Sequence, residues 1–222
     1  MTSSALERLY LVDAVEGEGE HVDVLVVGAG EVGGFYAERW ARAGHAVTLT
    51  FARDDAHAAA LAERVGAGWQ DAATDVRPDV VLLAVRLEHL AEARRHTGPL
   101  TGVVLLDAVN PFLPDRTGLV ALDGRTAADL VRAAWPQVRH VKALHSIGVQ
   151  RVRDAAGPVA AFVAGDDDGA TQVAERLTRD AGLLPVRTGG LATAAWSEPP
   201  GPLFSQAWSE AEARARLDDL VR

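Results

Sequence analysis

Short apolar runs alternate with segments of helical spacing along most of the chain. The apolar runs fall at 22–27, 46–51, 79–85, 102–107, 138–143, 159–164 and 183–186. Because runs such as VDVLVV and DVVLLAV are rich in β-branched residues and nearly free of polar ones, they are typical of strands buried on both faces of a sheet. The alternation predicts an α/β fold in which helices cover both faces of a parallel sheet.

The segments between these runs carry arginine and glutamate on one helical face and alanine, tryptophan or leucine on the other. They predict helices at 31–43, 55–65, 126–134, 168–181 and 209–221. The three aspartates at 166–168 are expected to cap the fourth of these helices rather than to bind a metal. Ser209 and Glu212 have the spacing of a capping box at the start of the last one.

Composition narrows the class of protein. The chain has 222 residues, a formal net charge of −9 and no cysteine. The negative charge and the lack of a basic run argue against a nucleic-acid partner. Without cysteine there is no disulfide, thiolate metal site or cysteine nucleophile, as is usual in the cytoplasm. No apolar run approaches the roughly 18 residues that span a bilayer, so we expect no membrane partner and a cytoplasmic location.

A glycine-rich turn, GAGEVGG at 28–34, follows the first apolar run and opens the first helix. In this context Gly28 permits a tight turn, Gly30 lets the backbone approach a pyrophosphate, and Gly33 allows the helix to pack closely on the strand. The free N–H groups at the helix start then hold the phosphates. The context, more than the motif itself, predicts a Rossmann-type dinucleotide site. The turn residues assigned to it are Gly28, Ala29, Gly30, Glu31, Val32 and Gly33.

The second apolar run ends in TFARD, at 50–54, where NAD-binding proteins commonly place a carboxylate beside the ribose. Arg53 suits the 2′-phosphate of NADP(H), since a charge-assisted hydrogen bond contributes about 1.5–3 kcal/mol. Thr50 is a second candidate for the same phosphate. Two alternatives stay open. Asp54 takes the ribose position in place of Arg53 if the strand ends one residue later, or Arg53 is only a solvated residue at a helix start.

Further motifs extend this pattern downstream in a fixed order. They are DVVLLAV, VVLLDAVNPF (103–112), HVKALHSIG (140–148), FVAGDDDGA (162–170) and GLLPVRTGGLATA (182–194). With the glycine turn and Arg53, the sequence resembles the NADPH-dependent reductases of the deazaflavin coenzyme, factor 420, over roughly residues 22 to 195. The resemblance implies a homodimer that moves hydride between NADP(H) and a deazaflavin or other flavin-like acceptor.

We expect the chain to divide into three parts. The start of the chain, which lies outside the resemblance, has the pattern of a short amphipathic helix followed by an acidic linker, and together these form an N-terminal arm (1–21). The resemblance implies a Rossmann domain (22–145) and a small C-terminal α/β part (146–222) that completes the acceptor site. Carried over from the family, Ala84, Val85, Asn110 and Pro111 border the dinucleotide. Arg86 follows the same strand end, and it either contacts a phosphate or acidic substrate or is a solvated helix-start residue.

One departure from the family lies at residues 141–146. Where the relatives commonly read V-K-A-F-N-T, this chain has VKALHS, which puts His145 and Ser146 near the expected nicotinamide. His145 either donates a proton to a substrate or replaces an amide as a hydrogen-bonding spacer. Near the C-terminal end, Trp196, Phe204 and Trp208 either close over a flat acceptor or serve core or dimer packing.

Three functions are therefore compared. The first is an NADP(H)-dependent oxidoreductase with a deazaflavin or flavin-like acceptor. The second is an NADPH-dependent reductase of a small carbonyl or imine, with His145 as proton donor. The third is a non-catalytic NADP(H)-binding module.

Overall fold

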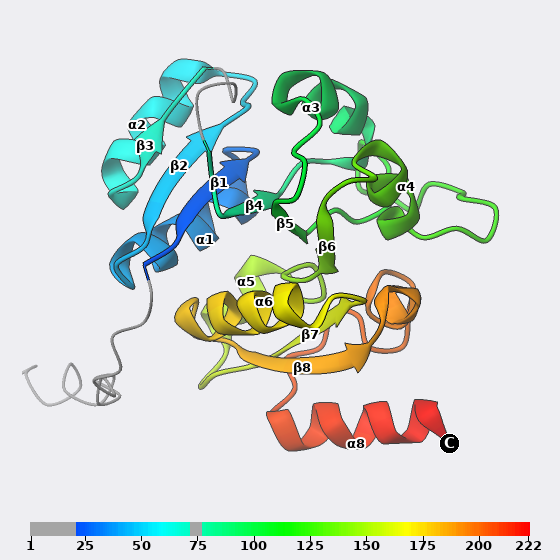
Figure 1. Ribbon diagram of the computed structural model, residues 1–222. Coiled ribbons are helices and arrows are strands. Elements are labelled where there is room, and N and C mark those ends of the chain that lie inside the picture. Colours follow the sequence, from blue (N-terminus) through cyan, green and yellow to red (C-terminus); the bar gives the residue numbers. More distant parts are fainter. Residues whose placement is uncertain (1–20, 72–76) are drawn as a thin grey trace, which may run out of the picture.

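The computed structural model describes residues 21–71 and 77–222 (Figure 1). The helix and linker expected before residue 21 lie outside these residues. The described strands form one eight-stranded sheet in the order β3-β2-β1-β4-β5-β6-β7-β8. Their bounds are Asp23–Val27 (β1), Ala46–Thr50 (β2), Gly68–Trp69 (β3), Val80–Leu83 (β4), Val104–Asp107 (β5), Arg139–Lys142 (β6), Ala160–Gly165 (β7) and Leu184–Gly189 (β8).

Strands β1 to β6 run parallel in the order that defines a Rossmann sheet, which confirms the predicted fold class. Helices lie between most consecutive strands. Their bounds are Glu31–Arg42 (α1), Asp55–Val65 (α2), Leu90–Thr97 (α3), Ala127–Ala134 (α4), Val149–Asp154 (α5), Asp168–Asp180 (α6), Ala194–Ser197 (α7) and Glu210–Val221 (α8), with short 3₁₀ turns at Leu87–His89 (η2) and Leu191–Thr193 (η3).

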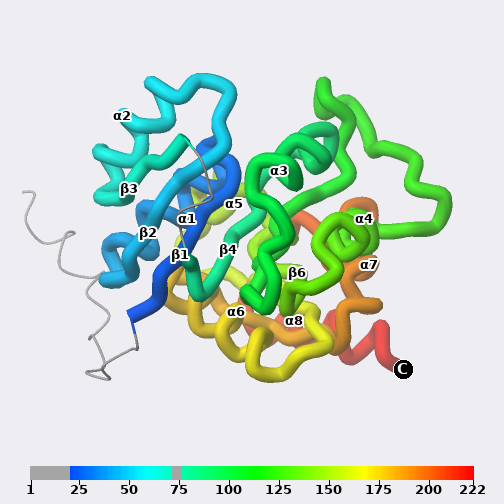
Figure 2. Tube along the Cα trace, turned by 45° about the horizontal axis from the view of Figure 1, so that its top comes forward, coloured from blue at the N-terminus to red at the C-terminus, as the bar shows by residue number. Residues whose placement is uncertain are grey.

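The sheet separates two cores, because alternate side chains of each central strand point to opposite faces. Val24 and Val26 of β1 pack in the core on the side of α1, α2, α5 and α6. Leu25 and Val27 pack in the core on the side of α3 and α4. Figure 2 shows α3 and α4 together on one side of the sheet and α6 on the other. The strands are thus buried on both faces, as their composition predicts.

The direction of the sheet reverses at β7. Strand β7 is antiparallel to β6 and parallel to β8, so the last two strands extend the same sheet in the opposite sense. The sequence pattern predicts this extension but not its direction, because a buried apolar run looks alike in either sense. Helix α8 packs on the outer part of the sheet, next to β8 (Figure 1).

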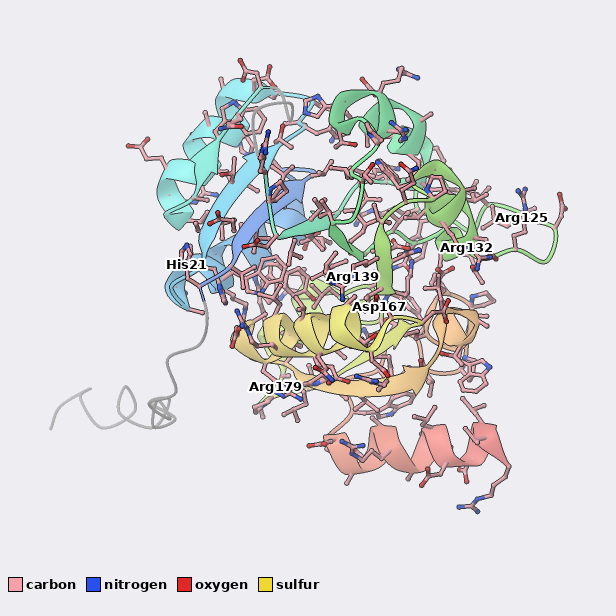
Figure 3. The ribbon with its side chains drawn as sticks, in the orientation of Figure 1. His21, Arg125, Arg132, Arg139, Asp167 and Arg179 are labelled. Carbon is pink, nitrogen blue, oxygen red and sulfur yellow. The ribbon has the colours of Figure 1, made fainter. Side chains whose placement is uncertain are left out.

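Polar residues at helix starts confirm the predicted caps. Asp167 accepts a hydrogen bond from the Ala170 N–H at the start of α6, and it also pairs with Arg139 of β6 at 2.7 Å (Figure 3). Ser209 and Glu212 form the capping box of α8. Each such cap contributes about 1 kcal/mol to the helix that it opens.

No helix in residues 21–71 and 77–222 combines the length and the apolar character that a membrane crossing requires.

Candidate functional site

A cavity of about 790 Å³ lies at the carboxyl ends of β1, β2 and β4. The strand order changes direction between β1 and β4, and open α/β sheets bind ligands at such a switch point. Several of the predicted cofactor residues meet there. Those that line the cavity are Gly28, Ala29, Gly30, Glu31, Arg53, Ala84, Val85 and Arg86.

The three glycines of the turn occupy three different environments. Gly28 has a φ of +112°, and a Cβ there would lie 2.5 Å from the carbonyl oxygen of Ala84. A Cβ on Gly33 would lie 2.0 Å from the carbonyl oxygen of Gly28, so the helix start packs directly on the strand end. A Cβ on Gly30, by contrast, would meet no atom within 4 Å. The open space beside Gly30 faces the cavity and leaves room for a ligand to approach the backbone.

The start of α1 supplies donors to this space. Gly30 is its N-cap residue, and no side chain caps the helix there. The first N–H groups of a helix have no partner within it, and the helix dipole adds partial positive charge at the same end. Such an end, open to a cavity, fits a pyrophosphate.

Arg53 is the charged group at the end of β2 that is available to a ligand. Its side chain is exposed, lines the cavity and makes no hydrogen bond or ion pair with any other described residue. The carboxylate of Asp54 accepts the N–H of His57 at 3.0 Å and caps α2. Strand β2 ends at Thr50, so Asp54 does not take the position expected of a ribose-binding carboxylate. Together with the glycine turn, this arrangement fits NADP(H).

Thr50, Val32 and Gly33 do not line the cavity. The hydroxyl of Thr50 is buried, donates to the Gln70 carbonyl at 2.8 Å and lies 2.7 Å from Nε2 of His96. Its side chain is therefore turned away from the position expected of a 2′-phosphate. Val32 packs against the core on the side of α1, and Gly33 serves the helix–strand contact.

Arg86 lines the cavity, but its guanidinium is already engaged. It donates to the carbonyl oxygen of Pro114 and lies 3.3 Å from the carboxylate of Glu88. These contacts tie the turn after β4 to the long segment after β5. Arg86 is therefore less free than Arg53 to bind a phosphate.

Asn110 and Pro111 follow β5, at the same edge of the sheet as Ala84 but outside the lining of the cavity. Nδ2 of Asn110 donates to the carbonyl oxygen of His145 at 2.8 Å, which joins the ends of β5 and β6. Oδ1 of Asn110 is buried and has no hydrogen-bond partner among the described residues. A free amide acceptor here suits the carboxamide of a nicotinamide.

His145 and Ser146 are both buried, and neither lines the cavity. Nε2 of His145 shares a hydrogen bond of 2.9 Å with the hydroxyl of Ser197. The hydroxyl of Ser146 accepts the N–H of Phe162 at 3.2 Å. Burial, with a smaller contribution from the charge of Lys142, lowers the pKa of His145 well below its ordinary value of 6.5. The ring is therefore neutral near pH 7, which disfavours its predicted role as a proton donor.

A buried cluster of charged side chains lies beside these residues, and sequence reasoning missed it. Nζ of Lys142 lies 3.3 Å from Asp107 and 2.8 Å from Glu198, and it also donates to the Val109 carbonyl. Glu198 accepts the first two N–H groups of α4 at 2.7 and 2.9 Å, and Asp107 bonds His140 at 3.0 Å. We call Asp107, His140, Lys142 and Glu198 the lysine cluster. One signal could have indicated it, because Lys142 is the only lysine of the chain.

The lysine cluster controls the ionisation of Asp107. Burial by itself would raise the pKa of this carboxyl group, but the charge of Lys142 and the hydrogen bonds from His140 and Val109 outweigh it. The net result is a pKa lowered to about 2. Asp107 is thus an anion at neutral pH, paired with Lys142 and closed to solvent.

Other lining residues carried no motif by which sequence reasoning could find them. Phe35, His57, Arg64, His89 and Arg153 come from four different helical segments and meet only in the folded chain. Arg153 belongs to α5, in the part of the chain after β6.

The aromatic residues around the proline-rich segment divide into two groups. Trp208 packs edge-on against Phe162 with ring centroids 5.9 Å apart, and Trp196 packs against the same core. Phe204 instead lies 6.0 Å from Phe112, which follows Asn110 in the chain. The two tryptophans are therefore half-buried residues that pack against this core. Phe204 instead reaches the side of the sheet where the acceptor is expected.

Within the described parts of the chain, no group of three or more histidine, aspartate or glutamate side chains could hold a metal ion. Asp166, at the start of α6, accepts the N–H of Leu191 at 2.8 Å and has a structural role.

The fold, the glycine turn and Arg53 define a Rossmann-type NADP-binding protein. Residues 23–111 match the family described as NADP oxidoreductase coenzyme F420-dependent, which confirms the resemblance seen in the sequence. The protein is an NADP-dependent oxidoreductase, and its residues 23–111 are similar to this family. No curated protein matches the sequence.

Solved structures with low sequence identity share the fold. A hypothetical protein from Sinorhizobium meliloti has a TM-score of 0.76 at 22% identity, over 85% of this chain and 95% of that one. A protein from Arthrobacter sp. FB24, provisionally assigned as an F420-dependent NADP reductase, has a TM-score of 0.65 at 22% identity, over 78% and 87%. A reductive aminase from Aspergillus terreus, bound to NADPH and ethyl levulinate, has a TM-score of 0.56 at 15% identity, over 90% and 61%.

Proposed function

We propose that the protein transfers hydride between NADP(H) and a deazaflavin or a similar flavin-like acceptor. One observation carries the choice of acceptor. The titratable side chains beside the expected nicotinamide, Asp107, Lys142 and His145, are all buried. None of them is placed to give a proton to a substrate, whereas reduction of a carbonyl or imine needs a proton as well as a hydride. A conjugated deazaflavin spreads the added charge over its ring system and needs alignment more than acid–base help.

When bound, NADP(H) supplies or takes up the hydride. The residues of the chain bind and orient it. The Gly28–Gly30 turn and the start of α1 hold the pyrophosphate, and Arg53 holds the 2′-phosphate. Asn110, fixed by its bond to the His145 carbonyl, orients the carboxamide. Phe112 and Phe204 offer an apolar surface on the acceptor side.

Reduction of a small carbonyl or imine is the second candidate. The position of His145 beside Asn110 and the fold shared with a reductive aminase favour it. The burial and the lowered pKa of His145 weigh against it. The histidine is better explained as a spacer that bonds Ser197 and positions the Asn110 segment.

Stopped-flow mixing of NADPH-loaded protein with oxidised deazaflavin tests the proposal. We expect the deazaflavin absorbance to bleach in step with NADPH oxidation, equally in wild type and in His145→Asn. Failure of a saturating deazaflavin to bleach, in protein shown to bind NADPH, would exclude the deazaflavin. Carbonyl or imine turnover that is lost in His145→Asn would support the second candidate instead. NADPH binding without turnover of any acceptor would support a non-catalytic module.

The proposal includes a homodimer located in the cytoplasm and a division of the chain after residue 145. Analytical ultracentrifugation of the protein checks the dimer. A monomer at micromolar concentration would contradict it. Limited proteolysis checks the division, because a boundary near residue 145 predicts cleavage there before cleavage inside the strands.

A further inference from the structure

We propose that Arg153, on α5, binds the pyrophosphate of NADP(H). This inference rests on the proposed placement of the dinucleotide over the glycine turn. It adds a binding residue from outside both the family match at 23–111 and the predicted dinucleotide domain at 22–145.

The position of Arg153 is the first argument. Its side chain lines the same cavity as Gly30 and Glu31. Its guanidinium carbon lies 5.5 Å from the ring centroid of Phe35, which is one turn after Glu31 in α1. The charged group of Arg153 is therefore held beside the first turns of α1, where the helix presents its free N–H groups.

The free charge of Arg153 is the second argument. The side chain is exposed, and it has no hydrogen bond or ion pair with any residue in the described part of the chain. A second guanidinium, that of Arg39, lies 4.4 Å from the same Phe35 ring. Arg39, however, donates to the carbonyl oxygen of Ala181 at 2.7 Å and does not line the cavity. In a chain whose net charge is −9, the unpaired guanidinium of Arg153 is therefore a local positive site that an anion would neutralise.

The carboxylates that face the cavity leave this positive site open. Glu38 pairs with Arg42 at 2.5 Å, and Asp54 caps α2. Glu31 and Glu92 also line the cavity, yet neither contacts Arg153 within ion-pair distance. An anionic ligand therefore meets the guanidinium without displacing a carboxylate of the protein.

The packing of α5 decides which phosphate Arg153 reaches. Helix α5 contacts α1, the helix that begins at the glycine turn, whereas Arg53 stands at the end of β2. The two arginines thus flank the glycine turn from different elements. We therefore assign the 2′-phosphate to Arg53 and the pyrophosphate to Arg153. The guanidinium of Arg153 can make two parallel hydrogen bonds with the pyrophosphate oxygens.

Equilibrium titration of three variants tests this assignment. Arg153→Met keeps an apolar side chain of similar length and removes the charge. Arg151→Met is the matched control, because Arg151 lies on the same helix, is exposed and does not line the cavity. Arg53→Met is the comparison for the 2′-phosphate. The ligands are NADPH, which carries both phosphate groups, and 2′-AMP, which carries only the 2′-phosphate.

We expect Arg153→Met to weaken NADPH binding about ten-fold, as loss of a charge-assisted contact does, and to leave 2′-AMP binding unchanged. Arg53→Met should weaken both ligands, and Arg151→Met neither. Equal NADPH affinities in Arg153→Met and Arg151→Met would overturn the inference. So would a matching loss of 2′-AMP binding in Arg153→Met. Wild-type protein that fails to bind NADPH would instead overturn the proposed function itself, and thermal melts of each variant exclude misfolding as the cause.

Discussion

Replacing Lys142 by Met tests the lysine cluster most directly. Methionine has nearly the same length and no charge, so it fills the space of the lysine stem and removes the ammonium group. Asp107 and Glu198, which are 0% and 3% exposed, then remain buried without their cation. Removing one partner of a buried ion pair costs about 3–5 kcal/mol.

The remaining contacts of the two carboxylates place the loss near the lower end of this range. Glu198 keeps its two N–H donors at the start of α4, and Asp107 keeps His140 and the Val109 N–H. We therefore expect a loss of about 3 kcal/mol in the free energy of unfolding, or roughly 6–12 °C in Tm for a chain of this size.

The pH dependence of this loss identifies its cause. In wild type the pKa of Asp107 lies at about 2, below the ordinary value of 3.8. Its stabilising contribution is therefore present above pH 3.8 and disappears as the pH falls toward 2. Without Lys142, burial raises the pKa of Asp107, and the folded variant takes up a proton before the unfolded chain does. The stability difference between wild type and variant should narrow as the pH falls from 7.5 to 4.5.

Urea unfolding of both proteins across that pH range measures the effect. Arg132→Met is the control, since Arg132 forms an exposed ion pair with Asp129 and its loss should cost less than about 1 kcal/mol. The ionised cluster would be refuted if Lys142→Met lost no more free energy of unfolding than Arg132→Met. It would also be refuted if the stability difference between wild type and Lys142→Met widened as the pH falls.

Five other substitutions test separate parts of the site. Arg53→Met should lower NADPH affinity about ten-fold and leave NADH unaffected in a binding titration, whereas Asp54→Ala should cost about 1 kcal/mol of stability and keep the cofactor preference. Gly30→Ala should fold normally and bind NADPH poorly, while Gly33→Ala should lose about 3 kcal/mol in urea unfolding, because its Cβ would lie 2.0 Å from a carbonyl oxygen. In wild type we expect stability to fall as the pH drops below 6.5, because the unfolded histidine takes up a proton that the buried ring resists. His145→Asn should remove part of this loss in urea unfolding.

Local patterns in the sequence predict the central strands and the caps well. The apolar runs mark buried strands, and most predicted helix bounds lie within one residue of those observed. Strand β3 has only two residues, so its sequence carries no periodic signal. The reversal at β7 is hidden for another reason, since burial on both faces leaves the same apolar run in either direction.

In the site, too, local motifs are predictable from the sequence, whereas contacts between distant residues are not. The glycine turn is a local motif, and its three glycines have the three environments that its pattern predicts. His145 is different, because its ring is buried and bonds Ser197, which lies 52 residues later in the chain. Arg153 likewise joins the cavity only because α5 packs on α1. Contacts between distant segments determine the roles of His145 and Arg153. These contacts cannot be predicted from residue spacing in the sequence.

The burial of Lys142 has a practical consequence for labelling. Lys142 is the single lysine of the chain, and its ε-amino group is buried. An amine-directed reagent therefore finds no ε-amino group on the surface of the folded protein. The group reacts only when the Glu198 segment and the end of β5 separate. The rate of Lys142 acylation therefore measures how often the acceptor side opens in the unmodified protein. A ligand bound on that side should slow the labelling of this one residue.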